Sequence, residues 1–249
     1  MDNRFGPFHA EKVWNDIGKI TGNDYATKDY DKIHSYLYDE SFPLTYPKIS
    51  ENCVLAKPGS PAEIVEILKY AGENRIPVVP RGGGTGVVGG AMPAYPGIIL
   101  SLERLNRVLE IDEKNLMMTL EGGATLSALL EALEKQGKLF FPIHPGDEGA
   151  EVGGMVATNA GGTRAVKHGI MRNHIKALEV VLPTGEIVSL GGKLLKNNMG
   201  YDLMQLMIGS EGTLGVITKV TLRLYAKNEF SNTMLVSFPS QEEASDAVP

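Results

Sequence analysis

The sequence has little cysteine and no excess of positive charge. Cys53 is the only cysteine among 249 residues, so an internal disulfide and a cysteine-rich metal centre are both excluded. Acidic residues outnumber basic ones by 30 to 24, which gives a net charge of −6. An acidic chain of this kind is a poor candidate for general nucleic-acid binding, and we expect no nucleic-acid partner.

Long apolar runs are also missing. No apolar stretch reaches the ~18 residues that a spanning helix needs, so we expect no transmembrane segment. Residues 1–9 contain no apolar segment of the kind found in a secretory signal peptide. Together with the single cysteine, these absences lead us to expect a cytoplasmic protein, or one held at the inner membrane through a partner.

Glycine, in contrast, is abundant. The chain has 29 glycines in 249 residues, about 12% against a usual ~7%. Most gather in residues 82–90, 146–169 and 185–215, each beside apolar, strand-like runs. Such clusters indicate ordered loops where the backbone approaches something closely or adopts a positive φ. Ordinary tight turns are the alternative, and a turn is sufficient to explain Gly185.

Hydrophobic periodicity predicts a mixed α+β chain. Helices are expected over residues 10–21, after a capping box of Ser60 and Glu63, and after the N-cap residue Thr125. A helix followed by a run of strands favours α+β over strict βαβ alternation. Strands are predicted at residues 76–80, 98–101, 108–111, 116–121, 177–182, 187–190 and 214–224, with a short helix over 202–208.

The first glycine cluster suits an anion. Residues 84–89 match G-x-G-x-x-G, but only eight residues lead from there to the next strand, which leaves no room for the crossover helix of a dinucleotide-binding unit. What remains is a glycine loop directly after a strand, whose successive N–H groups can bind phosphate or pyrophosphate. We expect this loop to face solvent when it is empty.

The second and third clusters consist mostly of small residues. Residues 152–164 could form a flat wall for a large planar ligand, although a close-packed turn region explains them equally well. Residues 209–218 join a short helix to a long strand, and an ordinary loop is again the alternative.

Three segments, taken in order, resemble the FAD-linked oxidase family: PRGGGTG from residue 80, GGMVATNAGG from residue 153 and GSEGTLGVIT from residue 209. This family has the flavin domain of the vanillyl-alcohol oxidase and p-cresol methylhydroxylase type. The branch that the chain resembles is that of D-lactate dehydrogenase and the glycolate oxidase flavin subunit. The resemblance covers residues 53–224. It implies two α+β subdomains with FAD between them.

The resemblance also implies an activity. We expect an FAD-dependent oxidoreductase that oxidises a 2-hydroxy acid such as D-lactate or glycolate by hydride transfer to flavin N5. The alternatives are a non-catalytic FAD-binding subunit, or a flavoenzyme of the same fold with another substrate, similar to alkyl-glycerone-phosphate synthase. An electron-transfer partner subunit is expected, and a homo-oligomer is left open.

By motif position, the resemblance implies which residues contact the cofactor. Relatives that attach FAD covalently have a histidine where this chain has Thr85, so noncovalent FAD is expected, and no metal. The expected cofactor-binding residues are Pro80, Arg81, Gly82, Gly83, Gly84, Thr85, Gly86, Pro145, Gly146, Gly153, Gly154, Thr158, Asn159, Gly161, Gly162, Arg164, His168, Gly169, Gly215, Val216 and Ile217.

The resemblance suggests three parts of the chain. Residues 1–47 are an N-terminal helical leader, 48–227 the FAD-binding domain, and 228–249 the beginning of a substrate or cap domain. In the last part, apolar residues 233–238 predict a strand, and Ser240 with Glu243 predicts a helix start. Relatives hold the substrate and the catalytic base in the domain that follows. We therefore assign no catalytic residue here and expect the native protein to continue.

Overall fold

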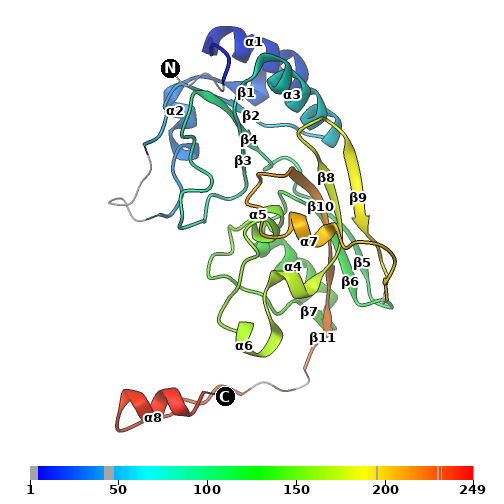
Figure 1. The fold of residues 1–249 in the computed structure, drawn as a ribbon. Helices are drawn as coiled ribbons and strands as arrows, with labels where there is room; N and C mark the ends of the chain where they lie inside the picture. The colour runs from blue at the N-terminus through cyan, green and yellow to red at the C-terminus, as the bar shows by residue number, and fades with distance from the viewer. Residues whose placement is uncertain (1–4, 42–47, 195, 229, 231, 249) are drawn as a thin grey trace.

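The computed structural model describes residues 5–41, 48–194, 196–228, 230 and 232–248. Its body consists of two β-sheets, one above the other in Figure 1, each with helices packed on it. The first sheet has the strand order β1-β2-β4-β3 and the second has the order β5-β6-β10-β8-β9, while β7 and β11 pair separately. This arrangement confirms the predicted α+β architecture.

The elements have the following bounds. The first sheet contains β1 (Ala26–Thr27), β2 (Cys53–Ala56), β3 (Val78–Arg81) and β4 (Gly97–Ser101). The second contains β5 (Val108–Asp112), β6 (Met117–Glu121), β8 (Ile175–Val181), β9 (Ile187–Gly191) and β10 (Val216–Arg223), and the separate pair is β7 (Leu139–Phe140) with β11 (Tyr225–Ala226). The α-helices are α1 (Ala10–Thr21), α2 (Tyr30–Ile33), α3 (Pro61–Asn74), α4 (Leu126–Gln136), α5 (Val152–Ala157), α6 (Ala165–His168), α7 (Met204–Met207) and α8 (Gln241–Asp246), and the 3-10 helices are η1 (Asn23–Tyr25), η2 (His34–Tyr36) and η4 (Met171–His174).

The first sheet is mainly parallel, which the sequence did not predict. β2 and β3 both run parallel to β4, with Cys53 opposite Gly97 and Val78 opposite Ile98. The helix α3 connects β2 to β3, whereas residues 82–96 connect β3 to β4 without a helix. That loop is long enough for a parallel connection by itself. Cys53 is buried in the core, as expected for a small apolar residue.

Both faces of this first sheet are covered. Alternate side chains of β2 and β4 point to opposite faces. Val54 and Ile98 pack with α1 and α3, while Leu55 and Ile99 pack with Ile33 of α2. The N-terminal segment therefore belongs to the core of the first subdomain, and its packing brings the residues after η2 to the edge of β3.

The second sheet is antiparallel and has its own core. β10 is its central strand, between β6 and β8, and α4 and α5 contribute Leu129 and Val156 to the apolar cluster beneath it. β8 and β9 form a hairpin whose turn contains Gly185 with φ +83°, as the sequence predicted. Thr125 caps α4 by accepting a hydrogen bond from Ala128 N at 3.2 Å, which was also predicted.

The junction between the two subdomains lies at Gly122 and Gly123, directly after β6. Gly122 N donates to Thr218 O and Gly123 N donates to Leu105 O, both at 2.8 Å, while Gly153 N of α5 donates to Gly122 O at 2.7 Å. A side chain at either glycine would collide with a backbone carbonyl group of β10 or of the loop after β4. Three backbone segments can approach the end of β6 here because Gly122 and Gly123 have no side chains.

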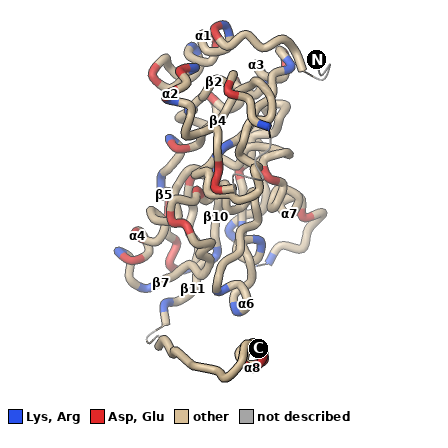
Figure 2. The backbone as a smooth tube through the Cα atoms, turned by 90° about the vertical axis from the view of Figure 1, so that its left-hand side faces the viewer, with Lys and Arg blue, Asp and Glu red and all other residues tan. Residues whose placement is uncertain are grey.

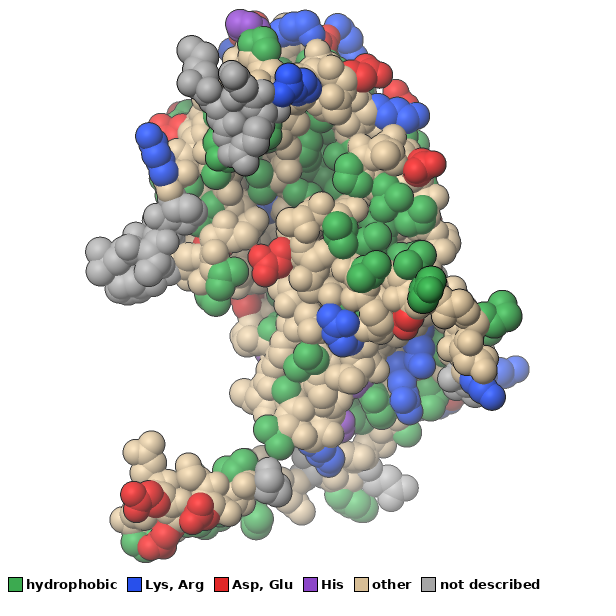
Figure 3. All heavy atoms as spheres, in the orientation of Figure 1, with side chains coloured by type: hydrophobic (Ala, Val, Ile, Leu, Met, Phe, Trp, Pro, Cys, Tyr) green, Lys and Arg blue, Asp and Glu red, His purple; other side chains and the backbone are tan. Residues whose placement is uncertain are grey.

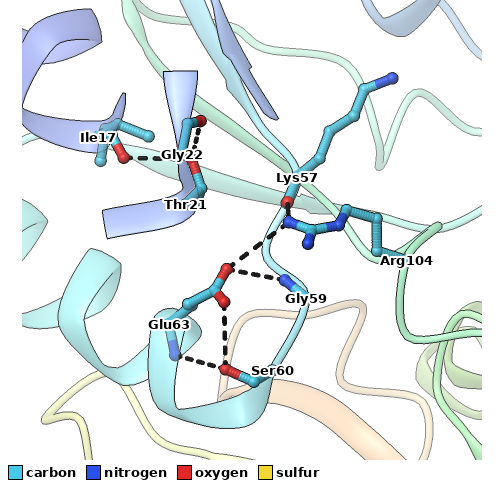
Figure 4. Close-up of polar contacts among 8 residues, drawn as sticks. All are labelled: Ile17, Thr21, Gly22, Lys57, Gly59, Ser60, Glu63 and Arg104. Atoms are coloured by element: carbon cyan, nitrogen blue, oxygen red, sulfur yellow. Dashed lines mark hydrogen bonds and ion pairs between the residues drawn. The ribbon is translucent and has the colours of Figure 1, made fainter. Parts of the chain in front are cut away.

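The cap of α3 differs in one detail from the predicted capping box. Ser60 Oγ accepts a hydrogen bond from Glu63 N at 3.2 Å, as expected. The Glu63 carboxylate, however, accepts a bond from Gly59 N at 2.8 Å instead of from Ser60 N. Arg104 Nη1 lies 3.8 Å from the same carboxylate and donates to Lys57 O at 2.8 Å, which ties the cap to the end of β2 (Figure 4).

The C-terminal residues do not form the predicted strand. Residues 233–238 pair with no described strand, and their side chains are exposed, Leu235 fully so. An apolar run becomes a strand only where a neighbouring strand satisfies its N–H and C=O groups. The predicted helix start is confirmed, since Ser240 Oγ accepts from Glu243 N at 3.2 Å, but α8 has no buried residue. Figure 3 shows this acidic helix set apart from the body.

An exposed apolar area lies around α7 on the body of the molecule, and we call it the α7 patch. Met199 and Tyr201 are 86% and 95% exposed, and apolar side chains gather around α7 in Figure 3. The patch consists of Leu194, Met199, Tyr201, Leu203 and Leu206. Elsewhere acidic and basic residues are interspersed on the side shown in Figure 2. Within the described part of the chain, no helix is long and apolar enough to cross a membrane.

The two serine caps provide a matched test of what packing adds to a helix. Ser60→Ala should lower the free energy of unfolding by about 1 kcal/mol, because α3 buries Ile64 and Ile67 in the core. Ser240→Ala removes the same bond from α8, which buries no residue, and should lower the free energy of unfolding by less than about 0.5 kcal/mol. Urea denaturation of both variants measures the difference. Equal losses of unfolding free energy in the two variants would contradict the difference in packing between α3 and α8.

Candidate functional site

A cleft of about 540 Å³ lies between the first sheet and the second. One wall is the loop after β3, the second is α5 with the turn that follows it, and the third is the segment that leads into β10. These are the three glycine segments identified in the sequence, brought together from different elements. The volume is in the usual range for a small-molecule or cofactor site.

The loop after β3 presents unpaired backbone donors. No described residue accepts a hydrogen bond from the N–H groups of residues 83–86. At its far end the loop is held by a hydrogen bond from Glu40 N to Gly86 O at 2.9 Å. Successive unpaired N–H groups in a cleft wall are suited to an anion such as phosphate.

The loop faces solvent in part, as expected: Gly83 is exposed, and Gly82, Gly84, Thr85 and Gly86 are half-buried. Its backbone is nevertheless in close contact with neighbouring groups. A Cβ atom at Gly83 would collide with the carbonyl group of Gly149, and one at Gly84, where φ is +73°, would collide with the Arg81 guanidinium. The loop therefore packs directly on the segment that precedes α5. A substitution of Gly83 would disturb this packing as well as any ligand.

Two adjacent glycines of α5 have different roles. Gly153 approaches the junction so closely that a Cβ atom there would lie 2.8 Å from Gly122 O. Gly154 has no atom within 4 Å of its Cβ position and lines the cleft. The first glycine permits close backbone packing, whereas the second leaves open space in the site.

The third segment is attached to the end of α5. Gly209 N donates to Val156 O at 3.1 Å and Glu211 N donates to Ala157 O at 2.8 Å. Arg172, which the sequence analysis did not single out, donates through Nη2 to Ile208 O at 2.9 Å. These bonds hold the segment against α5 and complete the third wall.

Most of the predicted cofactor-binding residues line this one cleft. Of the 21, 16 do so: Pro80, Arg81, Gly82, Gly83, Gly84, Thr85, Gly86, Pro145, Gly153, Gly154, Thr158, Asn159, Gly161, Gly215, Val216 and Ile217. Their role as cofactor contacts stays a prediction.

Five predicted residues lie outside the cleft lining: Gly146, Gly162, Arg164, His168 and Gly169. His168 belongs to a cluster of rings, 6.0 Å from Phe140 and 5.9 Å from Tyr225 between ring centroids. Gly162 packs against the backbone of His144. In the described part of the chain, no group of three or more His, Cys, Asp or Glu side chains is placed to hold a metal ion.

Three acidic residues of the cleft were not predicted from the sequence: Asp39, Glu151 and Glu211. Asp39 follows η2 and reaches the cleft only because the N-terminal segment packs on the first sheet. Glu151 directly precedes the glycine motif of α5, and no local pattern distinguishes it from a surface glutamate. Glu211 has φ +52°, a backbone conformation that is uncommon for a residue with a side chain.

Buried polar atoms without partners gather at the cleft. Asp39 Oδ2, Ser41 Oγ, Arg81 Nη1 and Glu151 Oε2 are buried and have no hydrogen-bond partner among the described residues. Three of these residues line the cleft, and Arg81 is otherwise held by a bond from Nη2 to Ser35 O at 3.1 Å. Unpaired buried polar atoms are rare in native proteins, so this cluster of them indicates a binding site for a polar ligand.

Burial also changes the acid–base properties of these groups. It raises the pKa of Glu151 to about 8, and the negative charge of Glu103 adds to the shift, while Arg81 opposes it. Burial lowers the pKa of Arg81 from its ordinary value, opposed by the charge of Asp39. At neutral pH the cleft therefore contains a cationic guanidinium and an uncharged carboxylic acid.

A second hollow of about 880 Å³ lies between α1, α2 and β2. Two of its lysines are already paired, Lys28 with Glu11 and Lys57 with Glu103. It contains none of the buried unpartnered atoms described above. The glycine-lined cleft is therefore the better candidate for the functional site, although it is the smaller of the two.

The raised pKa of Glu151 predicts how stability depends on pH. Between its ordinary pKa of 4.5 and about 8, the folded chain holds a proton that the unfolded chain has lost, so the free energy of unfolding falls as pH rises. Glu151→Gln does not titrate. The variant should gain stability over the wild-type chain between pH 5 and pH 8, on the order of 3–5 kcal/mol.

Thermal unfolding of the ligand-free chain at several pH values measures this gain in the free energy of unfolding. Glu148→Gln is the control, because the side chain of Glu148 is more than half exposed, and it should follow the wild-type profile. If the difference in unfolding free energy between Glu151→Gln and the wild-type chain stayed constant from pH 5 to pH 8, Glu151 would not be a buried acid with a raised pKa.

Comparison with known proteins places the chain among flavoproteins. A family model described as FAD binding domain matches residues 53–191. A D-lactate dehydrogenase of Archaeoglobus fulgidus is 48% identical over 214 residues, which are 86% of this chain and 48% of that protein. The glycolate oxidase subunit GlcD of Bacillus subtilis is 40% identical over 192 residues, 77% of this chain and 41% of that protein. The chain thus spans about half the length of the curated relatives it matches, or less.

A solved structure of an alkyldihydroxyacetonephosphate synthase has the same fold. It matches with a TM-score of 0.74 and 22% identity, over 89% of this chain and 41% of that one. The family match includes β2 to β9 and therefore the first two walls of the cleft. The chain belongs to the FAD binding domain family, and FAD is its cofactor.

Proposed function

We propose that this chain is the FAD-binding part of an oxidoreductase that converts a 2-hydroxy acid such as D-lactate or glycolate to the 2-oxo acid. The observation that carries the proposal is the cleft with its three glycine-rich walls and its unpartnered buried atoms. The relatives named D-lactate dehydrogenase and glycolate oxidase subunit support this class of substrate.

The cleft residues fit the chemistry of FAD. The unpaired N–H groups of residues 83–86 and the free Nη1 of Arg81 would hold the pyrophosphate, since both favour negative oxygen atoms. Gly154, Thr158 and Gly161 present little side-chain bulk and would lie against the flat ring system. When bound, FAD supplies the two-electron acceptor, and the protein positions it and tunes its environment.

The attachment of FAD is proposed to be noncovalent. Thr85 lines the cleft at the position where the resemblance places the histidine of covalent relatives. A threonine hydroxyl has no comparable tendency to bond with the flavin. The cofactor would then be held only by backbone, guanidinium and packing contacts, and its affinity would depend on an open cleft.

Gly154 offers a direct test of the cleft. Gly154→Leu should reduce FAD affinity by at least about 100-fold, because the side chain would fill open space in the site. Gly72→Leu is the matched control: Gly72 is also a helical glycine with nothing within 4 Å of its Cβ position, but it lies on α3, away from the cleft. Flavin fluorescence titration gives both affinities, and circular dichroism confirms folding. Unchanged affinity in a folded Gly154→Leu variant would refute the cleft assignment.

The activity is tested with the full-length, FAD-loaded protein. Anaerobic D-lactate or glycolate should bleach the flavin absorption band, and acid precipitation of the same sample should leave all yellow colour in the supernatant. If dithionite bleaches the flavin but no 2-hydroxy acid does, the substrate proposal fails. A non-catalytic FAD-binding subunit or a flavoenzyme with another substrate would then remain. Colour in the precipitate would contradict noncovalent attachment.

Partner and location are part of the same proposal. One relative is named as a subunit of glycolate oxidase, which supports an electron-transfer partner for this chain as well. The α7 patch is the surface that best suits such a contact, because exposed apolar areas commonly mark interfaces. We propose a cytoplasmic protein that reaches the inner membrane only through a partner. Cell fractionation with and without that partner would test this location.

A further inference from the structure

Glu151 is a buried side chain of the cleft that neither the glycine motifs nor the comparisons assign. It is only 7% exposed, it lines the cleft, and its Oε2 has no partner within the part of the chain that the structure describes. It also makes no capping bond to α5, although it occupies the N-cap position. The carboxyl group lies beside the first glycine loop, with Oε2 3.5 Å from the position of a Cβ atom at Gly82.

The backbone on both sides of Glu151 is held by hydrogen bonds. Ala150 O accepts a hydrogen bond from Leu126 N at 2.9 Å, and Val152 N donates to Ala124 O at 2.8 Å. Glu151 itself forms a β-bridge with Thr125. The backbone of Glu151 is therefore fixed, and its side chain leaves it at the wall of the cleft.

Three charged groups act on Glu151 and on its surroundings. Arg81 of β3 attracts its charged form, whereas Glu103 from the loop after β4 repels it. Asp39, from the segment after η2, acts on Arg81. Because Asp39 offsets part of the cationic charge, a second carboxylate at residue 151 would make the cleft unfavourable for an anionic cofactor.

FAD presents negatively charged oxygen atoms on its phosphates and carbonyl oxygen atoms on its ring, besides hydroxyl groups that both donate and accept. An ionised carboxylate would repel the phosphate and carbonyl oxygen atoms, whereas a carboxylic acid has one O–H to offer them. We propose that Glu151 is a cofactor-binding residue whose carboxyl group donates a hydrogen bond to an oxygen atom of FAD beside the first glycine loop. The proposal rests on FAD as the guest of the cleft and not on the identity of the substrate.

The test is the dissociation constant of FAD for the complete 249-residue chain between pH 6 and pH 9. For the wild-type chain it should be constant at low pH and rise toward tenfold per pH unit above about 8, as the donor proton is lost. Glu151→Gln retains an N–H donor and should bind with nearly wild-type affinity at pH 6 but show no such rise. Glu151→Leu has no donor and should bind about tenfold more weakly at pH 6, again without the rise.

Glu148→Gln is the control on the same segment and should reproduce the wild-type curve, because its side chain is exposed and outside the cleft lining. Circular dichroism at each pH confirms that every variant is folded. A rise in Glu151→Gln equal to that of the wild-type chain would overturn the proposal, as would full affinity of Glu151→Leu at pH 6. If the folded wild-type chain binds no FAD, the cleft assignment itself fails, whereas a failure to oxidise hydroxy acids would leave this inference intact.

Discussion

The close approach of three backbone segments at Gly122 and Gly123 is the constraint on which the rest of the structure depends. Here the end of β6 bonds to β10, to the loop after β4, and to the first turn of α5. The two sheets are joined through these bonds, and α5 is aimed at the edge of β3. Any side chain at the junction would separate the segments, so the cleft exists because these two residues have none.

The same reasoning explains why glycine is so abundant around the site. Gly83, Gly153 and Gly162 bring one backbone against another, and their removal would disturb the walls themselves. Gly154, in contrast, faces open space and leaves room for a guest. A glycine-rich motif therefore combines two physical roles, one in packing and one in binding, and only the surroundings of each residue distinguish them.

The electrostatics of the cleft follow from its burial. Arg81 and Asp39 balance each other in part, and Glu151 lies close to both the guanidinium and the glycine loop. In a site shielded from water, an unpaired charge is costly, so Glu151 retains its proton at neutral pH and becomes a donor. With Glu151 uncharged, the cleft presents one carboxylate fewer to an anionic cofactor.

The sequence by itself determined the helices α1, α3 and α4, because the apolar spacing of all three and the caps of α3 and α4 are local signals. The order of its three glycine segments also determined the family and most of the cleft lining. The tertiary structure alone decided the parallel pairing in the first sheet and the absence of a strand at residues 233–238, since both depend on neighbouring strands. It likewise decided that Asp39 and Glu151 face one cleft, because they meet through the packing of segments more than 100 residues apart, a distance over which no local pattern carries information.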